Sequence, residues 1–314
     1  MKKRYLIILL IFLSILSIFI GVKEIRITDI LALDDEKIKI ILVSRIPRLV
    51  SILAAGFSMS IGGLIMQQLT RNRFVSPTTA ATVDSARLGI LFSLIFFPAS
   101  SSILKMIISF AFALSGTMIF LKIMKNIKIK NKIFIPLVGI MLGNIIDSIT
   151  TFFAYRFDLV QNISSWLQGD FSMVLKGRYE LLYLSIPLIA LAYIYSSKFT
   201  VAGLGEDFSS NLGLDYNLIV NIGISIVSMS TAIVVITVGR MPFLGLIIPN
   251  IITLYFGDNL RKNLLPTGLL GAAFLVFCDI LGRIIIYPYE ISIGLTVGVI
   301  GSALFLYLLL RGDK

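Results

Sequence analysis

The sequence predicts an all-α, polytopic membrane protein with about ten transmembrane helices and both termini in the cytoplasm. Of its 314 residues, 57% are hydrophobic and only 14% are charged, whereas a soluble domain carries about 25% charged residues. So few charges cannot form a polar shell, and lipid must therefore cover much of the surface. Long apolar stretches such as 5–20 and 218–238 also lack the alternation of polar and apolar residues that barrel strands show. Helices therefore account for the pattern better than strands do.

Five spans are expected in the first half of the chain. They cover residues 5–22, 48–67, 80–97, 102–122 and 133–153. The start of the chain resembles a signal peptide, because an apolar run follows Lys2, Lys3 and Arg4. No small-residue cleavage site follows Ile20, however, so we expect the first span to be retained. The lysine-rich stretch 122–132 is expected in the cytoplasm, because basic loops are retained on that side.

Five further spans are expected in the second half. They cover residues 181–195, residues 218–238, a stretch that ends near Phe256, residues 264–286 and residues 291–310. The longest polar stretch of this half, 196–217, would then be a cytoplasmic segment, and the basic residues near 258–262 mark another inside loop. The chain is expected to form a single transmembrane domain over 1–314.

Composition excludes several classes of function. The chain has no His and one Cys, Cys278, so it cannot hold a histidine-ligated haem, an HExxH zinc site or a disulfide framework. No GxxxxGK sequence followed by Ser or Thr is present, so we expect no ATPase site of its own, no enzyme activity, no cofactor and no metal site. The net charge of +11 is assigned to cytoplasmic loops, so no nucleic-acid partner is expected.

Ionisable residues inside the expected spans are costly and often functional. They are Asp84, Arg87, Asp147, Asp279 and Arg283. Asp84 and Arg87 are three residues apart, and Asp279 and Arg283 are four apart, so each pair shares one helical face. A self-neutralising pair is the favoured interpretation, and a proton- or ion-coupling site is the alternative.

An ordered set of short motifs runs along the chain: RIPR at 45–48, SIGG at 60–63, TRN at 70–72, SP at 76–77, LGE at 204–206, LGL at 212–214, PFLGLIIP at 242–249 and EISIG at 290–294. In this order and spacing they resemble the FecCD-type permeases of ABC importers for iron-siderophore complexes and vitamin B12. The stretches 75–88 and 277–297 are most similar to permeases for catecholate siderophores, including petrobactin.

This resemblance implies a multi-pass permease of the bacterial cell membrane that moves ferric siderophores of the catecholate type into the cytoplasm. It implies a second permease subunit, more often a paralogue than an identical copy, two cytoplasmic ABC ATPase subunits, an external substrate-binding protein and a surround of membrane lipid. The sequence departs from the family at Asn250, where a His is usual, and at Asp84 and Arg87, where small neutral residues are usual.

Functional residues follow from the resemblance position by position. Docking of the binding protein is expected at Arg45, Arg48 and Arg283. Coupling to the ATPase is expected in 196–217, at Leu204, Gly205, Glu206, Phe208, Leu212 and Gly213. Cytoplasmic gates are expected at Asn72 with Phe74 and at Asn131 with Lys132, and an external gate at Phe157 with Asp158.

Each of these assignments has an alternative. The arginines could reach lipid headgroups, or Arg283 could pair with Asp279. Phe74 and Phe157 could be ordinary packing residues, and 196–217 an amphipathic linker on the lipid surface. For the whole chain, the alternative function is an ion-coupled secondary transporter, which often carries an internal repeat. We find no convincing repeat between the two halves.

Overall fold

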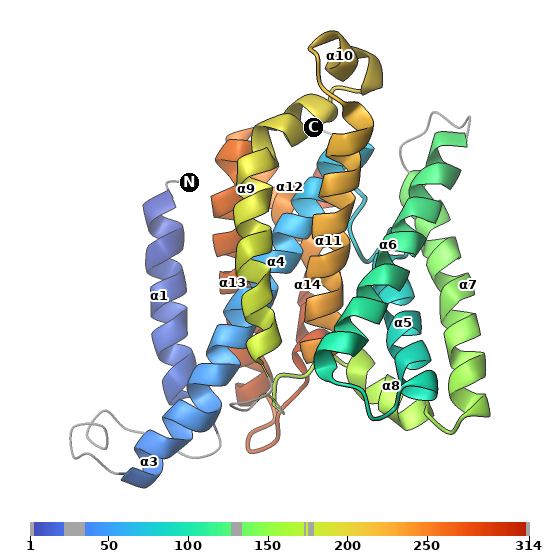
Figure 1. Ribbon diagram of the computed structural model, residues 1–314. Helices are drawn as coiled ribbons and strands as arrows, with labels where there is room; N and C mark the ends of the chain where they lie inside the picture. The colour runs from blue at the N-terminus through green and yellow to red at the C-terminus, as the bar shows by residue number, and fades with distance from the viewer. Residues whose placement is uncertain (1–2, 22–34, 127–133, 173, 175–178, 312–314) are drawn as a thin grey trace.

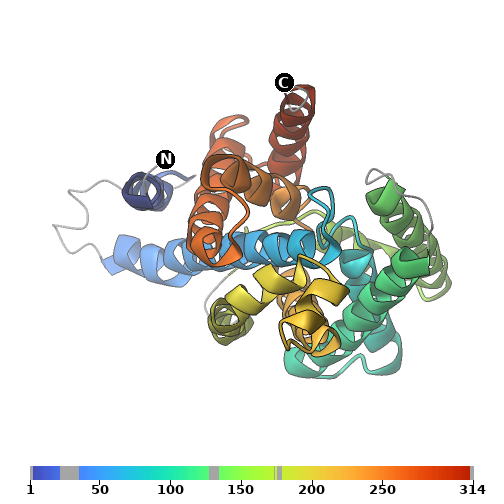
Figure 2. The ribbon, with the colours of Figure 1, turned by 90° about the horizontal axis from the view of Figure 1, so that it is seen from above.

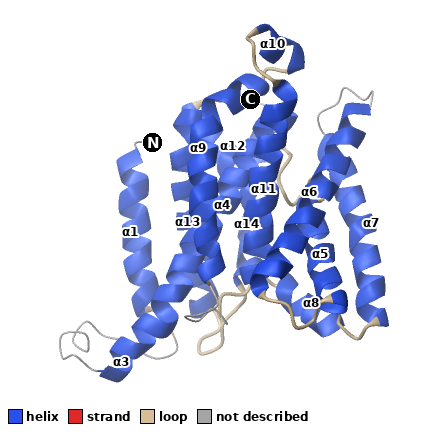
Figure 3. Cartoon of the chain, viewed as in Figure 1, coloured by secondary structure: helices blue, strands red, loops and turns tan. Residues whose placement is uncertain are grey.

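A computed structural model describes residues 3–21, 35–126, 134–172, 174 and 179–311. Within these ranges the chain forms helices and turns, without a strand (Figure 3). In order, the helices are α1 (Lys3–Phe19), α3 (Asp35–Ile40), the π-helical turn η1 (Ile41–Arg45), α4 (Ile46–Thr70), α5 (Thr82–Phe96), α6 (Ser102–Asn126), α7 (Phe134–Arg156), α8 (Val160–Leu167), the 3-10 turn η2 (Glu180–Leu184), α9 (Ser185–Ala202), α10 (Glu206–Asn211), α11 (Tyr216–Val238), α12 (Leu244–Phe256), α13 (Leu260–Ile284) and α14 (Ile293–Arg311).

The length and apolar character of the helices match a membrane protein. Within the described ranges, seven helices are long and apolar enough to cross a bilayer. They are the continuous helix 35–70, α6, α7, η2 with α9, α11, α13 and α14. Each of the ten predicted spans contains a helix, but α1, α5 and α12 have 17, 15 and 13 residues, fewer than the roughly 20 that one span needs. Ten complete spans therefore stay a prediction.

Helix α4 lies at the centre of the bundle. Viewed from above, it runs between α12 and α13 on one side and α9 and α11 on the other (Figure 2). Small residues permit this close packing, because a Cβ added at Gly56 would lie 2.7 Å from the Cα of Ala272, and one at Gly63 would overlap the backbone of Gly245. The core of the molecule is therefore built around α4.

The two ends of the bundle differ. The short helix α10 and both ends of the described chain lie toward one end, here named the α10 end, whereas α3 and α8 lie at the opposite α3 end (Figure 1). An ion pair of 3.8 Å between Lys125 at the end of α6 and Glu206 of α10 belongs to the α10 end. Lys125 and α10, both of which we expect on the cytoplasmic side, therefore lie at the same end of the bundle.

The polar stretch 196–217 is more helical than predicted. Helix α9 does not end near residue 195 but continues to Ala202, and α11 already begins at Tyr216. The cap of α11 is Asp215, whose carboxylate accepts a hydrogen bond of 3.0 Å from the Leu218 amide. The part of the stretch that lies outside the long helices is therefore 203–215.

Candidate functional site

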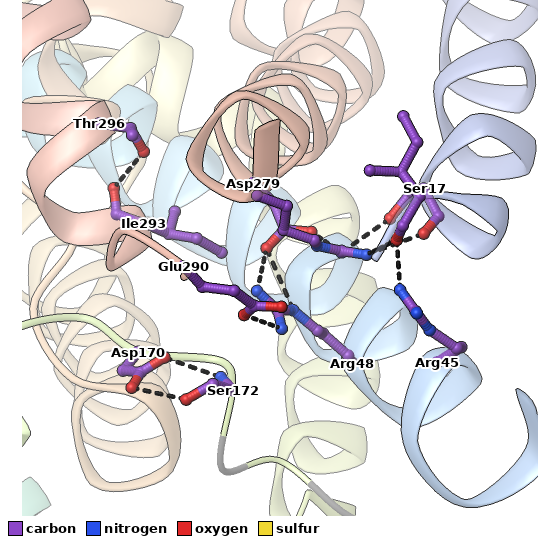
Figure 4. Close-up of polar contacts among 11 residues, drawn as sticks. Ser17, Arg45, Arg48, Asp170, Ser172, Asp279, Glu290, Ile293 and Thr296 are labelled. Carbon is purple, nitrogen blue, oxygen red and sulfur yellow. Dashed lines mark hydrogen bonds and ion pairs between the residues drawn. The ribbon is translucent and has the colours of Figure 1, made fainter. Parts of the chain in front are cut away.

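Three arginines and two carboxylates lie close together at the α3 end, and we name this group the arginine cluster: Arg45, Arg48, Asp279, Arg283 and Glu290 (Figure 4). Arg48 of α4 donates through Nε and Nη2 to Asp279 Oδ1 at 3.1 and 2.8 Å, and through Nη1 to Glu290 Oε2 at 2.6 Å. Arg283 forms an ion pair with Asp279, one turn earlier on α13. Asp279 thus holds two guanidinium groups from two helices.

The same cluster fixes the end of α1. Arg283 donates to the carbonyl oxygens of Ser17 and Ile20 at 2.9 and 2.8 Å and to Ser17 Oγ at 3.0 Å. Arg45 also donates to the carbonyl of Ile20. The last carbonyls of a helix lack intrahelical partners and carry partial negative charge, so cationic donors stabilise them. The arginines therefore join α1 to α4 and α13.

The three arginines are more buried than we predicted from the sequence. We expected the Arg45 and Arg48 guanidinium groups to face outward, but Arg48 is only 8% exposed, Arg283 3% and Asp279 0%, whereas Arg45 is half-buried. The pairing of Arg283 with Asp279, held open as an alternative, is present. The docking role of the three arginines stays a prediction.

At the α10 end, the segment 203–215 presents apolar side chains outward. Leu204, Phe208 and Leu212 are 56%, 51% and 60% exposed. Gly205 and Gly213 flank α10 with φ of +118° and +76°, a region that glycine enters without a steric penalty. The two glycines thus lie directly before the start and shortly after the end of α10. The coupling role of these residues stays a prediction.

The structure describes the residues of two of the three predicted gates. Asn72 is buried and its side-chain oxygen accepts from the Phe74 amide at 2.9 Å, while the Phe74 ring meets Phe305 of α14 edge-on at 6.2 Å. Phe157 is 48% exposed and Asp158 has φ of +55°, in the turn between α7 and α8. Asn131 and Lys132 lie outside the described residues. The structure therefore places the first and the external gate at opposite ends.

Two further polar positions were flagged by the sequence. Arg87 of α5 does not pair with Asp84 on its own helix but with Asp147 of α7. Asn250, at the position of the family histidine, donates through Nδ2 to the carbonyls of Arg73 and Leu246, both at 2.8 Å. Sequence spacing missed Asp147 as the partner of Arg87, because the two residues lie 60 positions apart.

A bundle of long apolar helices whose interior charges are paired is typical of a polytopic membrane protein. The comparisons specify the family. The profile of the FecCD transport family matches residues 9–311, and the chain belongs to that family. The predicted resemblance is thereby confirmed, and the protein is a multi-pass membrane protein.

Individual relatives agree with this assignment. The chain is 62% identical to the petrobactin import system permease protein YclN of Bacillus subtilis, over 99% of this chain and 98% of the relative. It is 38% identical to the petrobactin import system permease protein FatD of Bacillus anthracis, over 98% and 90% of the two chains. It is 37% identical to the ferric-anguibactin transport system permease protein FatD of Vibrio anguillarum, over 95% of each.

A solved structure shares the fold. A chain from an inward-facing conformation of a metal-chelate type ABC transporter superposes with a TM-score of 0.83 over 98% of both chains, at 21% sequence identity. Identity this low shows the fold alone. This chain therefore has the same fold as that transporter chain.

Proposed function

We propose that this chain is the membrane-spanning permease subunit of an ABC importer that brings ferric siderophores of the catecholate class, petrobactin among them, into the cytoplasm. The observation that carries the proposal is the 62% identity to a permease named for petrobactin import, over almost the whole of both chains. A chelated ferric ion brings its own oxygen ligands, so a path without His and with one buried Cys suits this cargo.

The importer would need further subunits. A second permease, a paralogue rather than an identical copy, would complete the path, and two cytoplasmic ABC ATPases would drive it. An external binding protein would deliver the chelate. This chain would contribute one permease domain over 1–314, with ten spans, both termini in the cytoplasm and no enzyme activity of its own.

The α10 end would face the ATPases. Leu204, Phe208 and Leu212 are exposed there, and burying three such side chains in a groove of a partner would contribute several kcal/mol at about 25 cal/mol per Å². Gly205, Glu206 and Gly213 would hold α10 in position. Nucleotide-driven movement of the ATPases could then reach the spans as a rigid-body motion.

The α3 end would receive the binding protein. Arg45, Arg48 and Arg283 would form the docking site, and carboxylates of the partner would have to compete with Asp279 and Glu290 for them. Gates would close the path at Asn72 with Phe74 and at Asn131 with Lys132 on the cytoplasmic side, and at Phe157 with Asp158 on the outside.

Uptake of radioactive iron as ferric petrobactin tests the function. Cells that lack their own siderophore importer receive this chain together with a partner permease, an ATPase and a binding protein from the same organism. Uptake should require all four and should stop when the catalytic carboxylate of the ATPase is replaced. Uptake that persists with an inactive ATPase and collapses with a proton ionophore would instead identify an ion-coupled secondary transporter.

A further inference from the structure

A group of charges lies between α5 and α7, away from both ends of α7. Arg87 of α5 forms an ion pair with Asp147 of α7. Asp84, one turn before Arg87, lies against α7 at Gly143, where an added Cβ would come within 2.5 Å of Asp84 Oδ2. Arg240, in the turn between α11 and α12, interacts electrostatically with both Asp84 and Arg87. We name these four residues, Asp84, Arg87, Asp147 and Arg240, the intramembrane charge group.

The depth of this group follows from helix geometry. Asp147 stands 13 residues after the first residue of α7 and 9 before the last, so at 1.5 Å per residue it lies about 20 Å from one end of the helix and about 13 Å from the other. Charged side chains at such depth are costly unless they are paired or face water. Contact with lipid therefore does not account for charged side chains at this depth of α7.

In the middle of α7, over residues 141–152, the exposed surface has two flanks, and toward the ends of the helix the exposed side chains of Leu137, Ile140 and Tyr155 continue the polar flank as an apolar one. Asn144, Asp147, Ser148 and Thr151 follow the spacing i, i+3, i+4, i+7 and share one side. The adjacent side carries Met141, Ile145, Ile149 and Phe152, which are 58%, 59%, 42% and 66% exposed. Helix α7 is at the outer edge of the bundle in both views and packs on α5, α6 and α8 (Figures 1 and 2). The apolar flank suits lipid and the polar flank does not.

The intramembrane charge group has spare donors. Arg87 and Arg240 each keep a buried Nε without a hydrogen-bond partner among the described residues, and Arg87 is 9% exposed. A guanidinium group has donors only, so an acceptor is what these atoms lack. The Asp147 side chain, 44% exposed, opens the group toward the polar flank of α7. A ligand that approaches along this flank would therefore be recognised through anionic oxygen atoms.

We propose that Arg87 and Asp147, with Asp84 and Arg240 behind them, form a transit site on the water-filled path through this permease, where Arg87 donates hydrogen bonds to anionic oxygens of the ferric chelate. The two carboxylates balance the two guanidinium groups, so the group has no net charge and would hold an anion only through hydrogen bonds from its unpaired donors. Conduction needs binding that is favourable enough to enter and weak enough to leave. This inference rests on the proposed function, because the chelate is the cargo assigned there.

The first arm of the test asks whether the polar flank faces water. In a Cys278→Ser background, Ser148→Cys should react with a small charged methanethiosulfonate reagent, because only a hydrated thiol ionises to the reactive thiolate. Ile149→Cys, its neighbour on the apolar flank, is the matched control and should stay unreactive. Ferric petrobactin presented with its binding protein should slow the reaction at Ser148→Cys. Equal inertness of both cysteines would overturn the proposal, whichever cargo the importer carries.

The second arm separates binding from packing. Arg87→Gln alone should lower ferric petrobactin uptake by about tenfold to a hundredfold, the loss expected for one hydrogen bond to a charged group. Arg87→Lys should restore part of the rate, because it keeps the charge. The double variant Arg87→Gln/Asp147→Asn leaves no buried charge unpaired, so it should recover expression and thermal stability but not uptake.

Uptake at the wild-type rate in the double variant would show that the pair only holds α5 to α7, and would overturn the proposal. Absence of ferric petrobactin uptake in the wild type would count against the proposed function instead, and the reactivity of Ser148→Cys would still decide whether the site lies on a hydrated path.

Discussion

At the residue scale, Asp279 has the most demanding position in the arginine cluster. It is fully buried and accepts from Arg48 on one helix while it pairs with Arg283 on its own. The pairing with Arg283 follows from the spacing i, i+4 and was predictable. The contacts of Arg48 with Asp279 and with Glu290 were not, because each joins residues more than 200 positions apart. The spacing of charged residues in the sequence shows which of them lie on the same side of one helix. It does not show which other helix packs against that side.

Replacing Asp279 by Asn should destabilise the fold strongly. The change leaves two buried guanidinium groups without their common counterion, and breaking a buried pair in this way costs about 3–5 kcal/mol. Titration with denaturing detergent should measure the loss in the free energy of unfolding. The exposed pair Arg73 and Asp258, 2.9 Å apart, offers the control, since Asp258→Asn should change that free energy by less than about 1 kcal/mol. Equal effects of the two variants would contradict this account.

Arg45 gives the cleaner test of docking at the α3 end. Arg48→Glu would place a third carboxylate beside Asp279 and Glu290 and would damage the cluster itself, whereas Arg45 is half-buried and bonds a backbone carbonyl. Arg45→Glu should slow association with the binding protein and weaken its dependence on salt, because complementary charge mainly accelerates encounter. Lys262→Glu at the α10 end should leave both unchanged. Unaltered association in Arg45→Glu would remove this arginine from the docking site.

At the element scale, glycines decide how closely α4 approaches its neighbours. Two adjacent glycines differ in this respect: a Cβ at Gly63 would overlap the Gly245 backbone, whereas one at Gly62 would reach only side chains at 3.7 Å or beyond. Ser58 and Gly62 are four residues apart, a spacing typical of helix packing through small residues, but the close backbone contact lies at Gly63. Which side of a helix meets a backbone depends on the neighbouring helix, and a single sequence does not reveal it.

This difference predicts opposite effects for two nearly identical substitutions. Gly63→Ala should destabilise the protein by about 1–3 kcal/mol, because overpacking moves α4 away from α12. Gly62→Ala should be neutral or slightly stabilising, because Ala is favoured over Gly inside a helix by about 1 kcal/mol. Thermal unfolding of the two purified variants in detergent measures both changes. Similar melting temperatures would show that α4 and α12 can separate without loss.

The exposed residues of α10 and its flanks belong to the same scale. Leu212→Asp should leave insertion and thermal stability unchanged, because Leu212 is 60% exposed. It should nevertheless abolish uptake and the stimulation of the ATPase, since a charge would have to enter the apolar contact. Ser210→Asp adds the same charge to an exposed position of α10 and should keep activity. Full ATPase stimulation in Leu212→Asp would exclude this surface from coupling.

At the scale of the whole molecule, the apolar runs made the helices predictable. Each expected span contains a helix because a run of about 20 apolar residues has few alternatives in a bilayer. The residues at which the helices end were less predictable. Helix α9 passes through Ser196, Ser197 and Lys198 and ends only before Gly203, because polar residues alone do not stop a helix, whereas glycine can.

The orientation of the whole bundle can be tested on one helix. In a Cys278→Ser background, a cysteine at Asn126, at the α10 end of α6, should resist an impermeant maleimide in intact cells. A cysteine at Ser101, immediately before the other end of α6, should be labelled. The reason is the basic residues near Asn126, which favour the cytoplasmic side. Labelling at Asn126 with protection at Ser101 would invert the orientation.

The continuous helix 35–70 has 36 residues, so at 1.5 Å per residue it is about 54 Å long, and the hydrocarbon it crosses is only about 30 Å thick. Even with a tilt, one end must stand in the headgroup layer or in water. The first turns carry four charged residues, Asp35, Glu36, Lys37 and Lys39. Moving their side chains into hydrocarbon would cost a large amount of free energy. They therefore set the vertical position of the helix, and through it the depth at which the rest of the bundle sits in the bilayer.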